Sequence, residues 1–183
     1  MPRVSEAHLA ARREQILAAA RELFAARGFA RTSMDDVVRA SGLSMGSVYR
    51  YFPSKSDLVI AVCEGHGGEV DGGFPAETPA ELVARLAGYV APGGSHARMA
   101  IQVWGEAAIV PQLAGTVTAT HQRLQDHLAG LLHCPDPASR DAVAQTALAA
   151  LIGLAALVAA GVEVDHERVV AVLAGLLDTR AEG

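Results

Sequence analysis

Two short helical patterns, each begun by a serine and joined by a tight turn, constrain the fold of this chain more than any other feature. Ser33 opens the first pattern and Asp36 follows three positions later, as in a capping box, where each side chain bonds the other residue's backbone. The turn falls at Gly42, and Ser44 opens the second pattern, which runs to Tyr51. Two capped helices with so short a connection are typical of a helix-turn-helix.

The rest of the chain also favours helices. Hydrophobic residues make up 51% of the sequence but aromatic residues only 4%, and the runs of residues that favour strands are scarce. We therefore predict an all-α protein of about nine helices, with a three-helix helix-turn-helix domain followed by a larger helical domain. The expected helices span about residues 5–27, 33–41, 44–51, 54–62, 78–91, 95–104, 111–131, 138–160 and 165–180.

Caps and helix breakers set the ends of these segments. Thr78 and Glu81 form a second capping-box pattern, with Pro79 at the first helical position that proline favours. Ser95 and Asp165 are expected to cap two further helices. Because glycine is a poor helix former, we expect the fourth helix to fray at glycines 65, 67, 68, 72 and 73.

Charge is distributed unevenly along the chain, whose net charge is −5. Residues 1–60 contain nine Lys or Arg and six Asp or Glu, a net charge of +3, and the remaining residues carry −8. A basic end on an acidic body indicates a DNA-contacting segment joined to a body that does not touch DNA.

The second helix of a helix-turn-helix lies in the major groove of DNA, and its side chains meet base edges. Arg50 is the best candidate for a bidentate contact with guanine, beside Met45 and Ser47. Phosphates are attracted to helix N-termini and to hydroxyl and ammonium groups, and glycine lets the backbone approach them closely. The expected backbone contacts are therefore Ser33, Ser44, Gly46, Tyr49, Tyr51 and Lys55.

Several of these residues also have a purely structural interpretation. Val48 and Phe52 are expected in the core, where Phe52 would pack the fourth helix on the third. Tyr49 can be partly buried, although a tyrosine hydroxyl usually seeks a polar partner. Arg12 and Arg13 fit a solvated helix face as well as a DNA contact.

The segment over residues 10–62 resembles the DNA-binding domain of the TetR family of transcriptional regulators. The similarity covers a third of the chain, with the pattern in order and without gaps. It is carried by Gly28-Phe29, Thr32-Ser33-Met34-Asp35-Asp36-Val37, Ala40-Ser41-Gly42-Leu43-Ser44, Gly46-Ser47-Val48-Tyr49, Tyr51-Phe52 and Ser54-Lys55-Ser56-Asp57-Leu58. One departure is that Val38 and Arg39 replace the alanine more usual after the helix-two aliphatic residue.

The resemblance implies a DNA-binding domain over residues 1–53 and a ligand-binding and dimerisation domain over residues 54–183. It implies a homodimeric repressor that binds a pseudo-palindromic operator in double-stranded DNA and is released by a small molecule. An activator, or a regulator controlled by a protein partner, is the alternative. The apolar, small-residue helices at 138–160 and 165–180 suit a twofold interface.

The ligand-binding residues are less well defined by the sequence. Met99, Val103 and Trp104 gather on one expected helix, Tyr89 precedes it, and His121 lies on an apolar face of a later helix. Each fits the core as well as a pocket wall. With eight aromatic residues in the chain, an aromatic cage for a quaternary cation has little material, so an apolar or mixed small molecule is expected.

No cofactor or metal is expected. His66, His96, His121, His127 and His133 lack the spacing of metal ligands on one helix. Cys63 and Cys134 lie in no metal or redox motif and are expected to be reduced thiols.

Other classes of protein are disfavoured. The sequence shows no hydrolase motif, phosphate loop or paired carboxylates of an all-α enzyme, although a Cys63–His66 nucleophile pair is conceivable.

Residues 142–162 carry no formal charge, but alanine and glycine dominate them, so we interpret them as a core or interface helix rather than a membrane span. Met1 to Ala11 has no apolar signal segment, so a cytoplasmic protein is expected. A helical interaction module, which would prefer no DNA sequence, is the remaining alternative.

Overall fold

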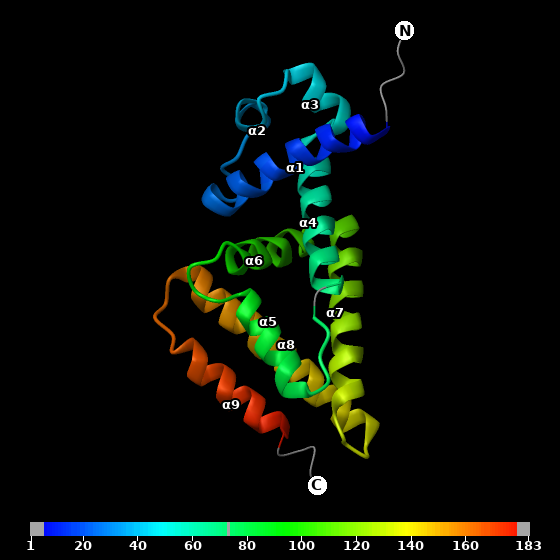
Figure 1. Ribbon diagram of the computed structural model, residues 1–183, viewed down its shortest axis with the longest axis vertical. Helices are drawn as coiled ribbons and strands as arrows, with labels where there is room; N and C mark the ends of the chain where they lie inside the picture. Colours follow the sequence, from blue (N-terminus) through cyan, green and yellow to red (C-terminus); the bar gives the residue numbers. More distant parts are fainter. Residues whose placement is uncertain (1–5, 73, 179–183) are drawn as a thin grey trace. The chain divides into compact units, whose positions relative to one another are not determined.

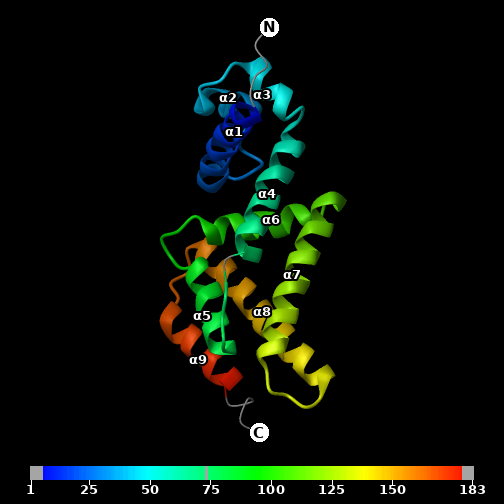
Figure 2. The same cartoon turned by 45° about the vertical axis from the view of Figure 1, so that its right-hand side comes forward.

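The computed structural model describes residues 6–72 and 74–178, and these residues form nine helices and no strand, as the sequence predicts (Figures 1 and 2). The chain divides into two compact units, Met1–His66 and Gly67–Gly183. This division falls within the fourth helix, later than the predicted domain boundary after residue 53. The assignment of DNA binding to residues 1–53 and of ligand binding and dimerisation to residues 54–183 stays a prediction.

The first unit is built from α1 (Glu6–Arg27), α2 (Met34–Ser41), α3 (Met45–Tyr51) and the start of α4 (Lys55–Gly72). Helices α1 and α2 pack together, and α2 contacts α3. The rings of Phe24 and Phe29 meet edge to face, with centroids 4.8 Å apart. Each of the four helices contributes fully buried side chains to this unit: Ile16, Phe24, Val37, Val48, Leu58 and Val62.

The caps predicted around the helix-turn-helix are present. The Asp36 amide donates to the Ser33 hydroxyl at 3.2 Å, and the Ser33 amide donates to the Asp36 carboxylate at 2.9 Å. The Ser47 amide donates to the Ser44 hydroxyl at 3.2 Å. Between the two helices Gly42 has a φ of +68°, in the left-handed region where glycine is at no disadvantage. Local sequence therefore fixes both ends of the turn.

Helix α4 does not fray where its glycines begin, and the expectation that it would is wrong. Its backbone stays helical to Gly72. At Gly65 an added Cβ would lie 3.3 Å from Nη2 of Arg21, the mobile end of a long side chain. The glycines of this segment therefore lie within a continuous helix rather than at its end.

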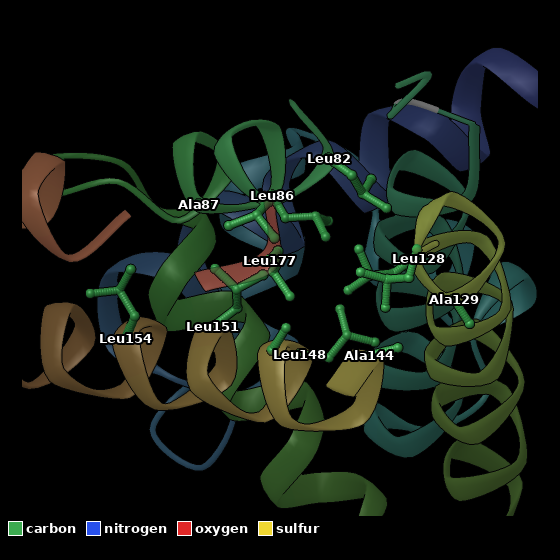
Figure 3. Packing of buried hydrophobic residues seen from close by; sticks show 13 residues of the cluster. Leu82, Leu86, Ala87, Leu128, Ala129, Ala144, Leu148, Leu151, Leu154 and Leu177 are labelled. Carbon is green, nitrogen blue, oxygen red and sulfur yellow. The ribbon is translucent and has the colours of Figure 1, made fainter. Parts of the chain in front are cut away.

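The second unit contains α5 (Pro79–Tyr89), α6 (His96–Ala107), α7 (Pro111–Leu131), α8 (Pro137–Ala160) and α9 (His166–Asp178). Helix α5 lies against α9, and α8 lies against α5, α6 and α7 (Figures 1 and 2). Leucine and alanine side chains from four of these helices fill the main core (Figure 3). They include Leu82, Leu86, Ala87, Leu128, Ala129, Ala144, Leu148, Leu151, Leu154 and Leu177.

Helix α8 is the one helix of the described residues that is long and apolar enough to cross a membrane by length and composition. The core helix of a soluble protein passes the same test. The buried residues of α8 follow a helical period and face the other helices of the unit: Ala144, Ala147, Leu148, Leu151, Leu154 and Ala155. This packing supports the interpretation of residues 142–162 as a core or interface helix.

Two caps of the second unit differ from the sequence pattern. Thr78 accepts a hydrogen bond from the Glu81 amide at 3.2 Å, but the Glu81 carboxylate accepts from the Glu77 amide at 2.9 Å rather than from Thr78. Ser95 precedes α6 with helical backbone angles and makes no side-chain cap bond. An N-cap hydroxyl reaches the helix amides from an extended backbone, so the geometry of Ser95 accounts for the missing bond.

The capping box of α2 predicts a pH-dependent stability. Hydrogen bonds from the Ser33 side chain and backbone, with Arg39 beside it, lower the pKa of Asp36 from 3.8 to about 2. The pKa of Asp36 is lower in the folded protein than in the unfolded chain, so the ionised carboxylate stabilises the fold. This stabilisation is complete above the usual pKa and is lost as the pH falls from about 4 to about 2. We expect Asp36→Asn to be less stable than the wild type at neutral pH, with a difference that shrinks over this window.

Thermal unfolding of both proteins across this pH range measures the difference. Asp35→Asn is the matched control, because it removes a charge from the same helix turn and leaves the capping box intact. A difference that is constant with pH, or an equal effect of Asp35→Asn, would contradict the role of the Asp36 carboxylate.

Candidate DNA-binding surface

Helix α3 presents one continuous stripe of exposed residues. Val48 and Phe52 lie four positions apart and are 0% and 2% exposed, so they anchor one side of the helix in the first unit. The sequence prediction that both belong to the core is confirmed. With this side anchored, the exposed stripe consists of Met45, Gly46, Tyr49 and Arg50.

The side chains of this stripe suit a DNA groove. Met45 is 53% exposed and Tyr49 40% exposed, so both side chains are accessible to a partner. Gly46 has open space where a Cβ would stand, so the backbone there can be approached closely. Arg50 adds a guanidinium on the same side, with its carbon 5.4 Å from the centre of the Tyr51 ring. Ser47, the third predicted base contact, is half-buried beside the stripe.

Ser33, predicted as a phosphate contact, is bonded to Asp36 in the structure, and its contact with DNA stays a prediction. Its amide and its hydroxyl both donate to the carboxylate of Asp36, at 2.9 and 2.6 Å. Arg39 bonds the same carboxylate, and Arg27 lies 3.7 Å from it. The Asp36 carboxylate therefore lies at the N-terminus of α2, and Ser33 and Ser44 are both exposed at the starts of their helices.

Tyr51 and Lys55 are held within the first unit. The Tyr51 hydroxyl is buried and has no hydrogen-bond partner among the described residues, unlike the exposed hydroxyl expected for a phosphate contact. The half-buried Lys55 donates from Nζ to the carbonyl of Ala30 at 3.4 Å. Tyr51 is the last residue of α3 and Lys55 the first residue of α4, and the contact of each with a phosphate stays a prediction.

Polar residues of α1 also reach the helix-turn-helix. The guanidinium of Arg13 lies over the Phe52 ring, 5.4 Å from its centre. Gln15 donates from Nε2 to the carbonyl of Ser41 at 2.7 Å. Sequence reasoning missed Gln15 because its partner is 26 residues away, and no local pattern marks such a pair.

The five predicted ligand-binding residues lie on α5, α6 and α7 of the second unit. Trp104 is 37% exposed and its ring meets that of His121 edge to face, with centroids 5.6 Å apart. Tyr89 instead lies near His96, with ring centroids 4.2 Å apart. Met99 and Val103 are buried in α6. The ring contacts thus bring Trp104 and His121 together, and a single site with all five residues stays a prediction.

The candidate metal and thiol residues are placed as follows in the described part of the chain. It contains no group of three His, Cys, Asp or Glu side chains arranged to hold a metal ion. Cys63 is buried, and the Cys134 thiol donates to the Asp136 carbonyl at 3.5 Å. The side chain of His66, named with Cys63 as a conceivable nucleophile pair, lies outside the described residues.

Comparison with known proteins supports the assignment of this surface. Residues 16–62 match the family model described as "Bacterial regulatory proteins, tetR family". A transcriptional repressor of helix-turn-helix type from Mycobacterium tuberculosis is 44% identical over 62 residues, which are 34% of this chain and 33% of that protein. The chain therefore matches about a third of this relative's length, at the helix-turn-helix end.

Solved structures extend the likeness to the whole fold. A TetR-like transcriptional regulator from Rhodococcus sp. RHA1 has a TM-score of 0.71 and 27% identity, covering 100% of this chain and 99% of that one. A putative transcriptional regulator from Saccharomonospora viridis, solved in complex with choline, has a TM-score of 0.76 and 20% identity, covering 92% and 96%. Both of these proteins are described as transcriptional regulators. Residues 16–62 of this chain therefore carry a helix-turn-helix domain of the TetR family, and the fold of the whole chain is similar to that of TetR-like regulators.

Proposed function

We propose that this protein is a homodimeric transcriptional repressor that binds a pseudo-palindromic operator and is released from it by a small molecule. The exposed stripe of α3 carries this proposal, because anchoring Val48 and Phe52 turns Met45, Tyr49 and Arg50 together toward solvent. Arg50 can donate two parallel hydrogen bonds to a guanine, and Met45 offers an apolar contact to a base. Since its partner is DNA, we place the protein in the cytoplasm.

An apolar face on α8 and α9 supports the dimer. Along α9, Leu177 is 3% exposed and joins the core, whereas Val169, Val172 and Leu176 are 41%, 58% and 61% exposed. Leu157 of α8 and Val162 in the following turn are also exposed, at 45% and 50%. Exposed apolar side chains on these two helices would be buried if they packed against their copies about a twofold axis. Such a dimer can set two recognition helices about one DNA turn apart.

The second unit supplies the proposed effector site around Trp104 and His121. Both side chains are partly exposed and meet edge to face, which leaves ring surface for an apolar or mixed ligand. The choline complex of the S. viridis regulator supports a small-molecule site in this fold. Helix α4 begins in the first unit and continues as one helix into the second, so it can transmit a change of state. The ligand must bind the DNA-released state more tightly to shift the equilibrium.

Substitutions on α3 test the DNA-binding surface. We expect Arg50→Ala to lose about 1–3 kcal/mol of discrimination at one operator position, because a bidentate base contact disappears. Lys55→Ala should weaken binding to all sequences and lower the salt slope by about one charge if Lys55 meets a phosphate. Selection of bound DNA from a random pool, followed by titrations at several salt concentrations, measures both effects.

Arg85→Ala is the matched control for these variants, because Arg85 is an exposed arginine of the second unit. It should leave operator binding unchanged. If the wild-type protein selects no sequence and does not retard DNA from its own upstream region, the repressor proposal fails.

Charge placed on the α9 face tests the dimer. We expect Val172→Asp and Leu176→Asp to convert the dimer to monomer, because a carboxylate buried at an apolar interface without a partner is costly. Light scattering with size-exclusion chromatography gives the mass, and circular dichroism checks that helix content is kept. Ile109→Asp is the control, since Ile109 is 78% exposed but lies outside α8 and α9. Dimers that survive both α9 substitutions would place the interface elsewhere.

The effector site is tested with ligands found by thermal shift. Trp104 is the only tryptophan of the chain, so its fluorescence reports directly on ligands that bind beside it. We expect a ligand that releases the operator to change this fluorescence. We expect His121→Ala to lower the affinity for that ligand by about tenfold, because the ring contact is lost. His127→Ala, an exposed histidine on the same helix, is the control. An equal loss in both variants, or operator release without a fluorescence change, would refute this site.

A further inference from the structure

The C-terminus of α2 is held by a side chain from α1. Ser41 is the last residue of α2 and is 5% exposed, and the last carbonyls of a helix have no amide partner within it. Gln15 supplies one by donating from Nε2 to the Ser41 carbonyl at 2.7 Å. A short hydrogen bond to a buried carbonyl is worth more than its exposed counterpart, because an unpaired carbonyl there would lose its hydration.

The amide of Gln15 is oriented at both ends. Arg12 donates from Nη1 to Gln15 Oε1 at 3.0 Å, which leaves Nε2 pointing at Ser41. The neighbours Ile16 and Leu17 are 0% and 2% exposed, so the backbone beneath Gln15 is fixed in the core of the first unit. The donor therefore stands at a defined place on a rigid helix, although the Gln15 side chain is itself largely exposed.

We propose that Gln15 is a positioning residue for α3, and this inference rests on the proposed function of α3 in DNA binding. Gly42, Leu43 and Ser44 are the residues between Ser41 and α3, so the place of the Ser41 carbonyl determines where α3 begins. A bidentate base contact by Arg50 depends on distances held within a few tenths of an ångström. Gln15 thus acts on base recognition through the turn, without touching DNA.

If Gln15 positions α3, its loss should affect DNA binding differently from the loss of a residue that only stabilises the fold. Gln15 carries no charge, so its loss should leave the salt dependence and the non-specific affinity for DNA unchanged. Only the specific affinity, which depends on the placement of α3, should fall. A residue that merely stabilises the fold would lower the unfolding temperature and leave the ratio of specific to non-specific affinity as it is.

The test compares Gln15→Met with the wild type, since methionine keeps the length of the side chain and removes the donor. We expect roughly a five- to tenfold loss of affinity for the selected operator, the effect of one lost hydrogen bond, with binding to random DNA within about twofold. Measurements are made well below the unfolding temperature. Gln122→Met is the matched control, because it removes a Gln amide bond of 2.9 Å to Asp126 on α7 of the second unit.

Hydrogen exchange of the free protein tests the same role without DNA. The Val48 and Phe52 amides of α3 bond the carbonyls of Ser44 and Val48 at 3.1 and 3.0 Å. We expect both to exchange at least about fivefold faster in Gln15→Met, while the Leu58 amide of α4 is unchanged. If the wild type shows no sequence preference, the repressor proposal fails and the exchange result alone decides the role of Gln15.

The inference is overturned by either of two results. One is unchanged exchange in α3. The other is a fall in unfolding temperature while the ratio of specific to non-specific affinity stays constant, which is the mark of a purely structural residue.

Discussion

The burial of Val48 and Phe52 is the interaction on which the rest of the first unit depends. Helix α3 has only seven residues, too few to be stable alone, so its orientation comes from tertiary packing. Two side chains one turn apart, 0% and 2% exposed, fix its rotation about its axis. That rotation determines which side chains of α3 face solvent and are free to meet a partner. The caps and the turn decide where the helix lies, and this pair decides which way it faces.

Much of the first unit could be predicted from the sequence because its signals are local. Ser33 with Asp36, Gly42, and Ser44 lie within a few residues of the bonds they make, so spacing alone identifies them. The family resemblance added the roles of the exposed residues of α3. Sequence spacing could not reveal contacts between residues far apart in the chain, such as the hydrogen bond from Gln15 to Ser41. Nor could it show that the Tyr51 hydroxyl points inward, because that depends on how α3 packs against its neighbours.

The second unit was predicted in outline but less well in detail. Helix ends followed proline and capping signals, yet Ser95 makes no cap bond because its own backbone is helical. The apolar residues of α9 were expected on one face. In the structure Leu177 is buried in the core, while Val172 and Leu176 are exposed to solvent. The apolar residues of α9 are therefore divided between the core and the protein surface. Which residue goes to which surface depends on the position of α5, which no pattern within α9 encodes.

The small side chains on the buried side of α8 have a consequence for how the two units tolerate change. Ala144, Ala147 and Ala155 are at most 2% exposed, so neighbouring helices come close and a larger residue would have to displace them, at about 1–3 kcal/mol. In the first unit Phe24 and Ile16 fill the space instead, and truncating either to alanine leaves a void that costs about 2–5 kcal/mol. We therefore expect the two units to be sensitive to opposite substitutions: larger residues along the buried side of α8 and smaller residues in the core of the first unit.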